Sequence, residues 1–243
     1  MSLTELPILR EAIVKRPITN VIADKIAGLI ASGILQVGDP LPSERELASA
    51  LNVSRDAVRG GVQILAARGI LEISHGARTR VRSADVGPVT VGLATARAVD
   101  AYDLDSVHAA RLLIERQVVA DAARNIGPRE LALLDGHLAT QKSALDDPVR
   151  FLISDRAFHI AVYRAAANPL LADFSTDLYG YMMEYRRRAV ARPDAIATSY
   201  ADHVAIVAAL RAHDPEAAAA AFAVHTGRIY TTTQLLIEEG DGA

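Results

Sequence analysis

The chain has 243 residues, 51% of them hydrophobic and 5% aromatic, which suits two folded domains and excludes a disordered protein. It has no cysteine, so disulfides, thiolate metal sites and cysteine nucleophiles are excluded. The net charge is −3, but residues 1–82 carry 11 Lys/Arg against 8 Asp/Glu, whereas residues 83–243 carry 15 against 21. A basic end on an acidic body is typical of a protein that places only that end against phosphates.

The first ten residues lack the basic stretch and apolar run of a signal peptide. Apolar runs elsewhere are too short to span a bilayer. We therefore expect a cytoplasmic protein without a membrane partner.

Two helices are predicted early in the chain. Residues 19–33 place apolar side chains at helical spacing, and Gly33 supplies a C-terminal stop. Ser43 and Glu46 have the spacing of a capping box, which predicts a short helix that runs to about Leu51.

After a two-residue turn, Ser54 is expected to cap a further helix that ends near Arg68. Two β-prone runs follow, Ile70–Ser74 and Thr79–Arg82, with a tip at residues 75–78. Helix, helix, turn, helix and a two-stranded wing together predict a winged helix-turn-helix DNA-binding domain over residues 1–82.

Residues 83–100 are rich in small residues and are expected to be a linker, with or without a short helix. From residue 101 to 240 the pattern is helical throughout, which predicts an antiparallel all-α bundle of about six helices. The fold class is therefore mainly α. Breaks are expected at Gly127-Pro128, Asp147-Pro148, Asn168-Pro169, Pro193 and Asp214-Pro215.

The second helix of a helix-turn-helix enters the major groove with its N-terminal residues toward the bases. Arg55 and Arg59 share one face of that helix, and arginine pairs bidentately with guanine or clamps a phosphate. A solvated surface would explain any one of these arginines equally well. The candidate DNA-binding residues are Arg45, Ser54, Arg55, Arg59, His75, Gly76 and Arg78.

Four residues of the helical region are candidate metal ligands. Asp155 and His159 project from one face of one helix, and His203 and His225 lie on the last two predicted helices. Imidazole and carboxylate suit zinc, nickel, manganese or iron. Spacing alone is equally compatible with a surface hydrogen-bonded pair and half-buried histidines.

The run LPSERELASALNVSRDAVRGGVQILAARGIL resembles the head of GntR-type bacterial regulators, and HGARTRV resembles their wing. This resemblance covers residues 19–82. It implies that Arg45, Arg55 and Arg59 contact operator DNA and that the wing residues His75 and Gly76 approach the minor groove. This chain departs from the family pattern at Gly60-Gly61, where the family usually has Glu-Ala or a similar pair. Because glycine disfavours the interior of a helix, the two glycines are expected to bend or fray the recognition helix.

Three further runs, ARLLIERQVVADAA, SDRAFHIAVYRAAANPLL and DHVAIVAALRAHDPEAAAAAFAVH, resemble the ligand-binding (FCD-type) domain of the FadR-like branch of that family. The resemblance covers residues 102–230 and implies a bundle with a central cavity. It also places Asp155, His159, His203 and His225 on that domain's metal ligands. Zinc is the expected ion, with nickel and manganese as alternatives. Acyl-CoA-binding members lack this complete set, which argues against such a ligand.

Arg111 matches the arginine of the family's R-x-x-x-E pattern, with Glu115 four residues later. The pair is explained by a simple helical ion pair or by an arginine that grips an effector carboxylate, so that a carboxylic acid would bridge the metal and Arg111. Asn168 is interpreted as an N-cap. His108, His137 and His213 are expected at the surface.

The leading hypothesis is a homodimeric, non-enzymatic regulator of transcription, a repressor or an activator, that binds double-stranded operator DNA under the control of a small organic acid. A metal-dependent hydrolase or lyase is the first alternative, but it lacks a clear general base and leaves the N-terminal domain unexplained. The second alternative is a regulator whose metal is purely structural or is itself the signal.

Overall fold

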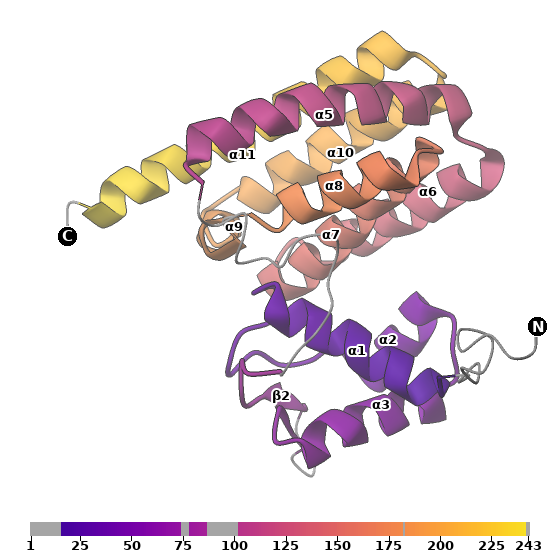
Figure 1. Cartoon of the computed structure of the whole chain (residues 1–243), viewed down its shortest axis with the longest axis vertical. Helices are drawn as coiled ribbons and strands as arrows, with labels where there is room; N and C mark the ends of the chain where they lie inside the picture. The colour runs from indigo at the N-terminus through magenta and orange to yellow at the C-terminus, as the bar shows by residue number, and fades with distance from the viewer. Residues whose placement is uncertain (1–15, 74–77, 87–101, 182, 242–243) are drawn as a thin grey trace, which may run out of the picture.

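The computed structural model describes residues 16–73, 78–86, 102–181 and 183–241 (Figure 1). These residues form an N-terminal part, called the head below, and an all-helical part, called the body. Figure 1 shows the head, in indigo and purple, beneath the body. Helices dominate both, which confirms the mainly α fold class. Within the described residues, no helix is long and apolar enough to cross a membrane.

The head contains the helices and strands that the sequence predicts. Its elements are α1 (Ile18–Ala31), α2 (Glu44–Leu51), α3 (Arg55–Ala67), β1 (Leu71–Glu72) and β2 (Arg80–Val81). At the start of α2, the Ser43 amide donates to Glu46 at 2.9 Å and the Glu46 amide donates to Ser43 Oγ at 3.3 Å. At the start of α3, Ser54 Oγ accepts from the Ala57 amide at 3.2 Å. The reciprocal cap at Ser43 and the single cap at Ser54 therefore fix the starts of α2 and α3.

The wing is shorter than the sequence suggests. β1 and β2 pair antiparallel with Leu71 opposite Val81, and both of these side chains are buried in the core of the head. The wing tip, with His75 and Gly76, lies outside the described residues, as does most of the expected linker at residues 83–100.

The expectation that the recognition helix frays at its middle is wrong. Helix α3 is continuous through Gly60 and Gly61. A Cβ at Gly61 would lie 2.7 Å from Ile22 Cγ2 and 3.1 Å from the Thr19 carbonyl oxygen. A Cβ at Gly60 would lie 2.6 Å from Thr19 Cγ2. The two glycines therefore let α1 pack close against α3, a tertiary reason that outweighs their low helix propensity.

Gly61→Ala is expected to destabilise the protein by about 1–3 kcal/mol, because the new methyl group meets Ile22 and a backbone oxygen that cannot move alone. Gly136→Ala in α6 is the matched control, because a Cβ there has nothing within 4 Å, and it should stabilise by up to about 1 kcal/mol. Urea unfolding followed by circular dichroism measures both. Equal effects of the two substitutions would contradict the packing explanation.

The body has seven helices in its described part. They are α5 (Leu104–Asn125), α6 (Pro128–Lys142), α7 (Pro148–Ala165), α8 (Pro169–Tyr179), α9 (Met183–Val190), α10 (Ala195–Arg211) and α11 (Pro215–Asp241). All five expected breaks are present, and the side chain of Asn168 caps α8 through the Leu171 amide at 3.2 Å. One break, after Tyr179, was not predicted, because the chain turns at Gly180 without a proline.

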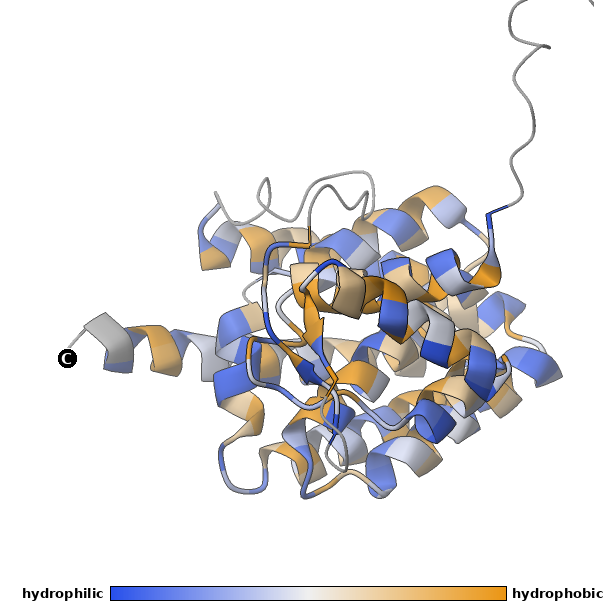
Figure 2. Cartoon of the chain, turned by 90° about the horizontal axis from the view of Figure 1, so that it is seen from below, coloured by the Kyte–Doolittle hydropathy of each residue, from blue (hydrophilic) through white to orange (hydrophobic). Residues whose placement is uncertain are grey.

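Head and body pack against one another around the end of α1. Ile34, which follows α1, belongs to the core of the body, while Val149 and Ile153 of α7 pack against the core of the head. The guanidinium of Arg187 in α9 donates to the Ile34 carbonyl at 2.5 Å and pairs with Asp39 at 2.9 Å. Figure 2 shows hydrophobic and hydrophilic residues recurring in turn along the helices, a pattern compatible with helices that bury one face.

Candidate metal centre and nucleic-acid interface

The four candidate metal ligands meet inside the body. Helix α7 contributes Asp155 and His159, α10 contributes His203 and α11 contributes His225. All four are buried, and one donor atom from each lies within 4.8 Å of the others. Three helices, of which α7 is distant in sequence from the consecutive α10 and α11, thus bring the residues implied by the family resemblance to one point.

The distances between these atoms suit a divalent cation. His225 Nε2 lies 3.2 Å from His159 Nε2 and 3.3 Å from His203 Nε2. Asp155 Oδ1 lies 3.4 Å from His203 Nε2 and 3.8 Å from His159 Nε2. Bonds of about 2.0–2.1 Å at tetrahedral angles would separate neighbouring donor atoms by roughly 3.3 Å. The cluster is therefore close to the size that a bound ion requires.

The outer nitrogens of two histidines face oxygen atoms. His203 Nδ1 lies 2.8 Å from Gln141 Oε1, and an amide oxygen can only accept, so the Nδ1 carries the proton. His225 Nδ1 lies 3.5 Å from a carboxylate oxygen of Asp202. The contact with Gln141 directs an unprotonated Nε2 of His203 toward the centre, as polar partners of metal-binding histidines do, whereas the Nδ1 of His225 has no hydrogen-bond partner among the described residues.

The third histidine is oriented through a tyrosine. Tyr163 donates its hydroxyl proton to Glu115 Oε1 at 2.8 Å, which leaves its oxygen to accept from His159 Nδ1 at 3.3 Å. On the remaining ligand, Asp155 Oδ2 accepts from Tyr179 at 2.5 Å and from Arg186 at 3.4 Å. Lone pairs of three imidazoles and one carboxylate thus point at one position, an arrangement that a cation stabilises.

Burial keeps the imidazoles of His159 and His203 neutral. It lowers the pKa of His159 and of His203 well below the ordinary 6.5, and the nearby His225 adds to the effect in both cases. Neutral imidazole is the form that binds metals.

The stability of the metal-free protein is expected to fall as the pH drops below about 6.5. Below that pH the unfolded chain binds protons at these two histidines, whereas folded His159 and His203 stay neutral because their pKa values are lowered. Their contribution to the stability is therefore complete above the unfolded pKa and is lost as the pH falls toward the lowered pKa of the folded state. Urea unfolding between pH 8 and pH 5 measures this. A free energy of unfolding that is unchanged over that range would contradict the assignment.

Two arginines lie beside the centre. Arg111 donates from Nε to Glu115 at 3.1 Å, and both residues are buried, so this is not the surface ion pair that the spacing alone allows. Arg186 of α9 was missed by sequence reasoning, because it stands in a run of three arginines that nothing in the sequence distinguishes. Its guanidinium stacks on Tyr179, 4.1 Å from the ring centroid, and contacts Asp155.

A cavity of about 610 Å³ opens next to two of the candidate ligands. Helices α7, α9, α10 and α11 enclose it. Its charged and ligand-bearing lining consists of Asp155, Arg186, Arg192, Asp194, Asp202, His225 and Arg228. A molecule of metabolite size in this cavity would reach the centre from solvent.

The described DNA-reading candidates are all at the surface of the head. Arg45, Ser54, Arg55 and Arg78 are exposed. Arg59 is exposed too, but its guanidinium pairs with Glu44 at 2.9 Å and with Asp56 at 3.3 Å. These two carboxylates therefore compete with DNA for its guanidinium.

With this geometry in place, comparisons with known proteins agree on a family. The family model "Bacterial regulatory proteins, gntR family" matches residues 18–81, and the FCD domain model matches residues 106–228. The HTH-type transcriptional repressor NanR of Edwardsiella tarda is 30% identical over 234 residues, which cover 93% of this chain and 89% of that protein. The chain is a GntR-family regulator with an FCD domain.

Other relatives support the same conclusion. NanR of Cronobacter sakazakii is 28% identical over 95% of this chain and 90% of its own. Among solved structures, E. coli McbR/YncC superposes with a TM-score of 0.56 at 21% identity, covering 92% of this chain and all of that one. This similarity shows a shared fold. This GntR regulator is therefore a DNA-binding transcription factor and not an enzyme, so the hydrolase or lyase alternative is set aside.

Proposed function

We propose that this GntR regulator is a repressor whose operator affinity is controlled by a small carboxylic acid. The acid would bind at a divalent ion, zinc first and nickel or manganese as alternatives, held by Asp155, His159, His203 and His225. The convergence of their four donor atoms carries this proposal. Repression is inferred from the NanR relatives, which are named as repressors.

The charges around the centre favour an acidic effector. Buried Arg111 and Arg186 balance buried Glu115 and Asp155. A divalent ion adds two positive charges, and half-buried Asp202 offsets one. An anionic ligand would offset the excess that remains, and buried charge is costly unless it is compensated. In this proposal Arg111 anchors the acid.

Helix α9 supplies a route from the centre to the head. Arg186 contacts the candidate ligand Asp155, and the next residue, Arg187, contacts Ile34 and Asp39 in the segment between α1 and α2. Two subunits in a two-fold dimer would present two α3 helices to a pseudo-palindromic operator. An effector that moves α9 would then change the relative placement of the two heads.

The direct test is operator binding by metal-loaded protein while small carboxylic acids are titrated. A coupling of about 1–3 kcal/mol is typical of allosteric proteins and corresponds to a change of roughly 5–150-fold in operator affinity. Metal-free protein is the control and should not respond. If no acid changes the affinity of the metal-loaded protein, acid control is disproved, although DNA binding itself stands.

Arg187→Ala is expected to weaken the effect of the acid on operator affinity without weakening acid binding, because it removes the hydrogen bond and the ion pair that join α9 to the head. Arg188→Ala is the matched control, since Arg188 is exposed on the same helix. Calorimetry measures acid binding and fluorescence anisotropy measures operator binding. An unchanged response in the Arg187 variant would exclude this route.

A further inference from the structure

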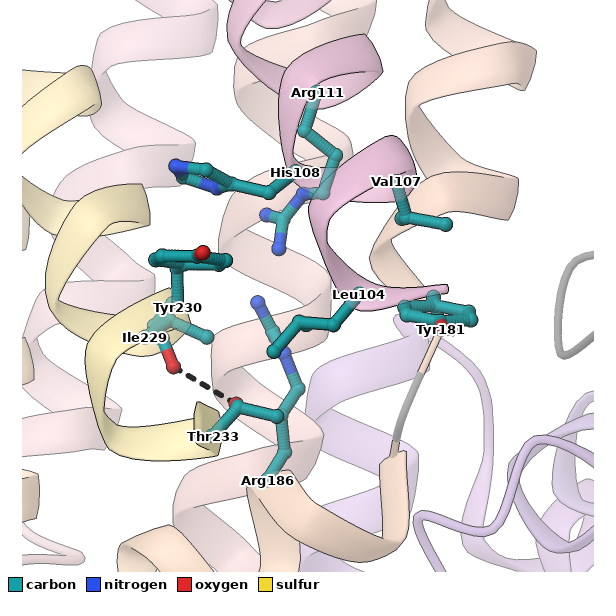
Figure 3. A pocket seen from close by; sticks show the side chains of 9 residues that line it. All are labelled: Leu104, Val107, His108, Arg111, Tyr181, Arg186, Ile229, Tyr230 and Thr233. Carbon is teal, nitrogen blue, oxygen red and sulfur yellow. Dashed lines mark hydrogen bonds between the residues drawn. The ribbon is translucent and has the colours of Figure 1, made fainter. Parts of the chain in front are cut away.

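A small second cavity lies between α5, α9 and α11 (Figure 3). Its volume is about 20 Å³, enough for roughly one water-sized group. Figure 3 shows the guanidinium groups of Arg111 and Arg186 pointing toward one another across it. His108 and Tyr230, whose rings stack with centroids 4.0 Å apart, form one side of it.

Both arginines have an unused donor at this cavity. The Nη2 atoms of Arg111 and Arg186 are buried and have no hydrogen-bond partner among the described residues. The two residues are only 7% and 4% exposed. A buried cationic donor without an acceptor is costly, and two like charges that face one another increase that cost.

The neighbouring carboxylates do not fill the gap. Glu115 accepts a hydrogen bond from Nε of Arg111, and Asp155 accepts one from Nη1 of Arg186. The other residues that line the cavity are uncharged or histidine, and burial together with the charge of Arg111 lowers the pKa of His108. An anionic oxygen from outside the described chain would complete both guanidinium groups.

We propose that the effector carries two acid groups, one at the metal centre and one between Arg111 and Arg186, and is therefore a small dicarboxylic acid. This rests on the proposed function. Arg186 and Ile229 line both this cavity and the larger one beside Asp155 and His225, so the two cavities are neighbours, and in this proposal one molecule occupies both. The small volume admits one carboxylate oxygen, which would accept from both Nη2 atoms.

The test compares two series of acids with metal-loaded, full-length protein by calorimetry. The probes are malonate, succinate and glutarate, against monocarboxylates of matched chain length. At least one diacid is expected to bind about tenfold or more tightly than its matched monoacid, because a charge-assisted hydrogen bond is gained. Arg186→Gln and Arg111→Lys should reduce that preference to about twofold or less, whereas Arg188→Gln on the same helix should keep it. Metal content and circular dichroism establish that each variant is loaded and folded.

Equal binding of diacids and monoacids by the wild type would overturn the inference while leaving control by a carboxylic acid intact. Binding of neither series would instead count against the proposed function. A third arm titrates inorganic phosphate. If phosphate raises the melting temperature of the wild type but not of the Arg186→Gln variant, and diacids show no advantage, the cavity holds a separate anion and the diacid assignment is wrong.

Discussion

His203→Ala is expected to lower the affinity for Zn²⁺ by at least about 100-fold. Loss of an outer-shell partner alone costs 10–100-fold, and His203 is placed to be a direct ligand, with its Nε2 within 3.4 Å of both Asp155 and His225. Competition with a chromophoric chelator measures the affinity. His213→Asn is the control, because His213 is an exposed histidine at φ 51, a conformation that asparagine tolerates.

The same variant separates a sensing metal from a structural one. If the metal transmits the effector signal, the operator affinity of folded His203→Ala protein should no longer change when acid is added. If the metal only ties α7, α10 and α11 together, the variant should lose stability and keep the acid response. Unchanged zinc affinity would remove the metal centre from the proposal altogether.

Arg55→Ala is expected to cost about 1–3 kcal/mol of operator affinity, roughly 5–150-fold, and to relax the base preference at one position if Arg55 reads guanine. Arg59→Ala should cost less, because Glu44 already pairs with the Arg59 guanidinium and competes with DNA for it. Anisotropy with a panel of operator variants measures both effects. Arg68→Ala, exposed at the far end of α3, is the control.

The pattern of the loss shows what Arg55 contacts. A uniform loss on all operator sequences, with a smaller salt dependence, would show that it holds phosphate and reads no base. No loss at all would contradict the placement of the start of α3 in the major groove.

Local features of the sequence were sufficient for most of the fold. Capping residues such as Ser43 and Ser54 and the prolines that begin α6, α7, α8 and α11 act within one helical turn, so they can be recognised without tertiary information. The break at Gly180 has no such marker. The interpretation of the two glycines of α3 was wrong because they are explained by the close approach of α1. That approach is a tertiary contact, which no local sequence pattern shows.

The candidate site shows the same division. Asp155 and His159 share a helix face by spacing, but their meeting with His203 and His225 is a tertiary event that only the family resemblance anticipated. The arginines at 186–188 are equivalent in the sequence. In the structure Arg186 is buried and contacts Asp155, Arg187 pairs with Asp39 of the head, and Arg188 is exposed. Their different roles depend on the direction in which each leaves α9.

The close packing of α3 on α1 has a consequence for regulation. Without side chains at positions 60 and 61, α1 and α3 leave no space to slide past one another, and well-packed contacts of this kind do not deform gradually. A signal that arrives at the end of α1 would turn the head as a single rigid unit. The effector would then alter the phase of the two recognition helices along the duplex, while the base sequence that each one prefers stays the same.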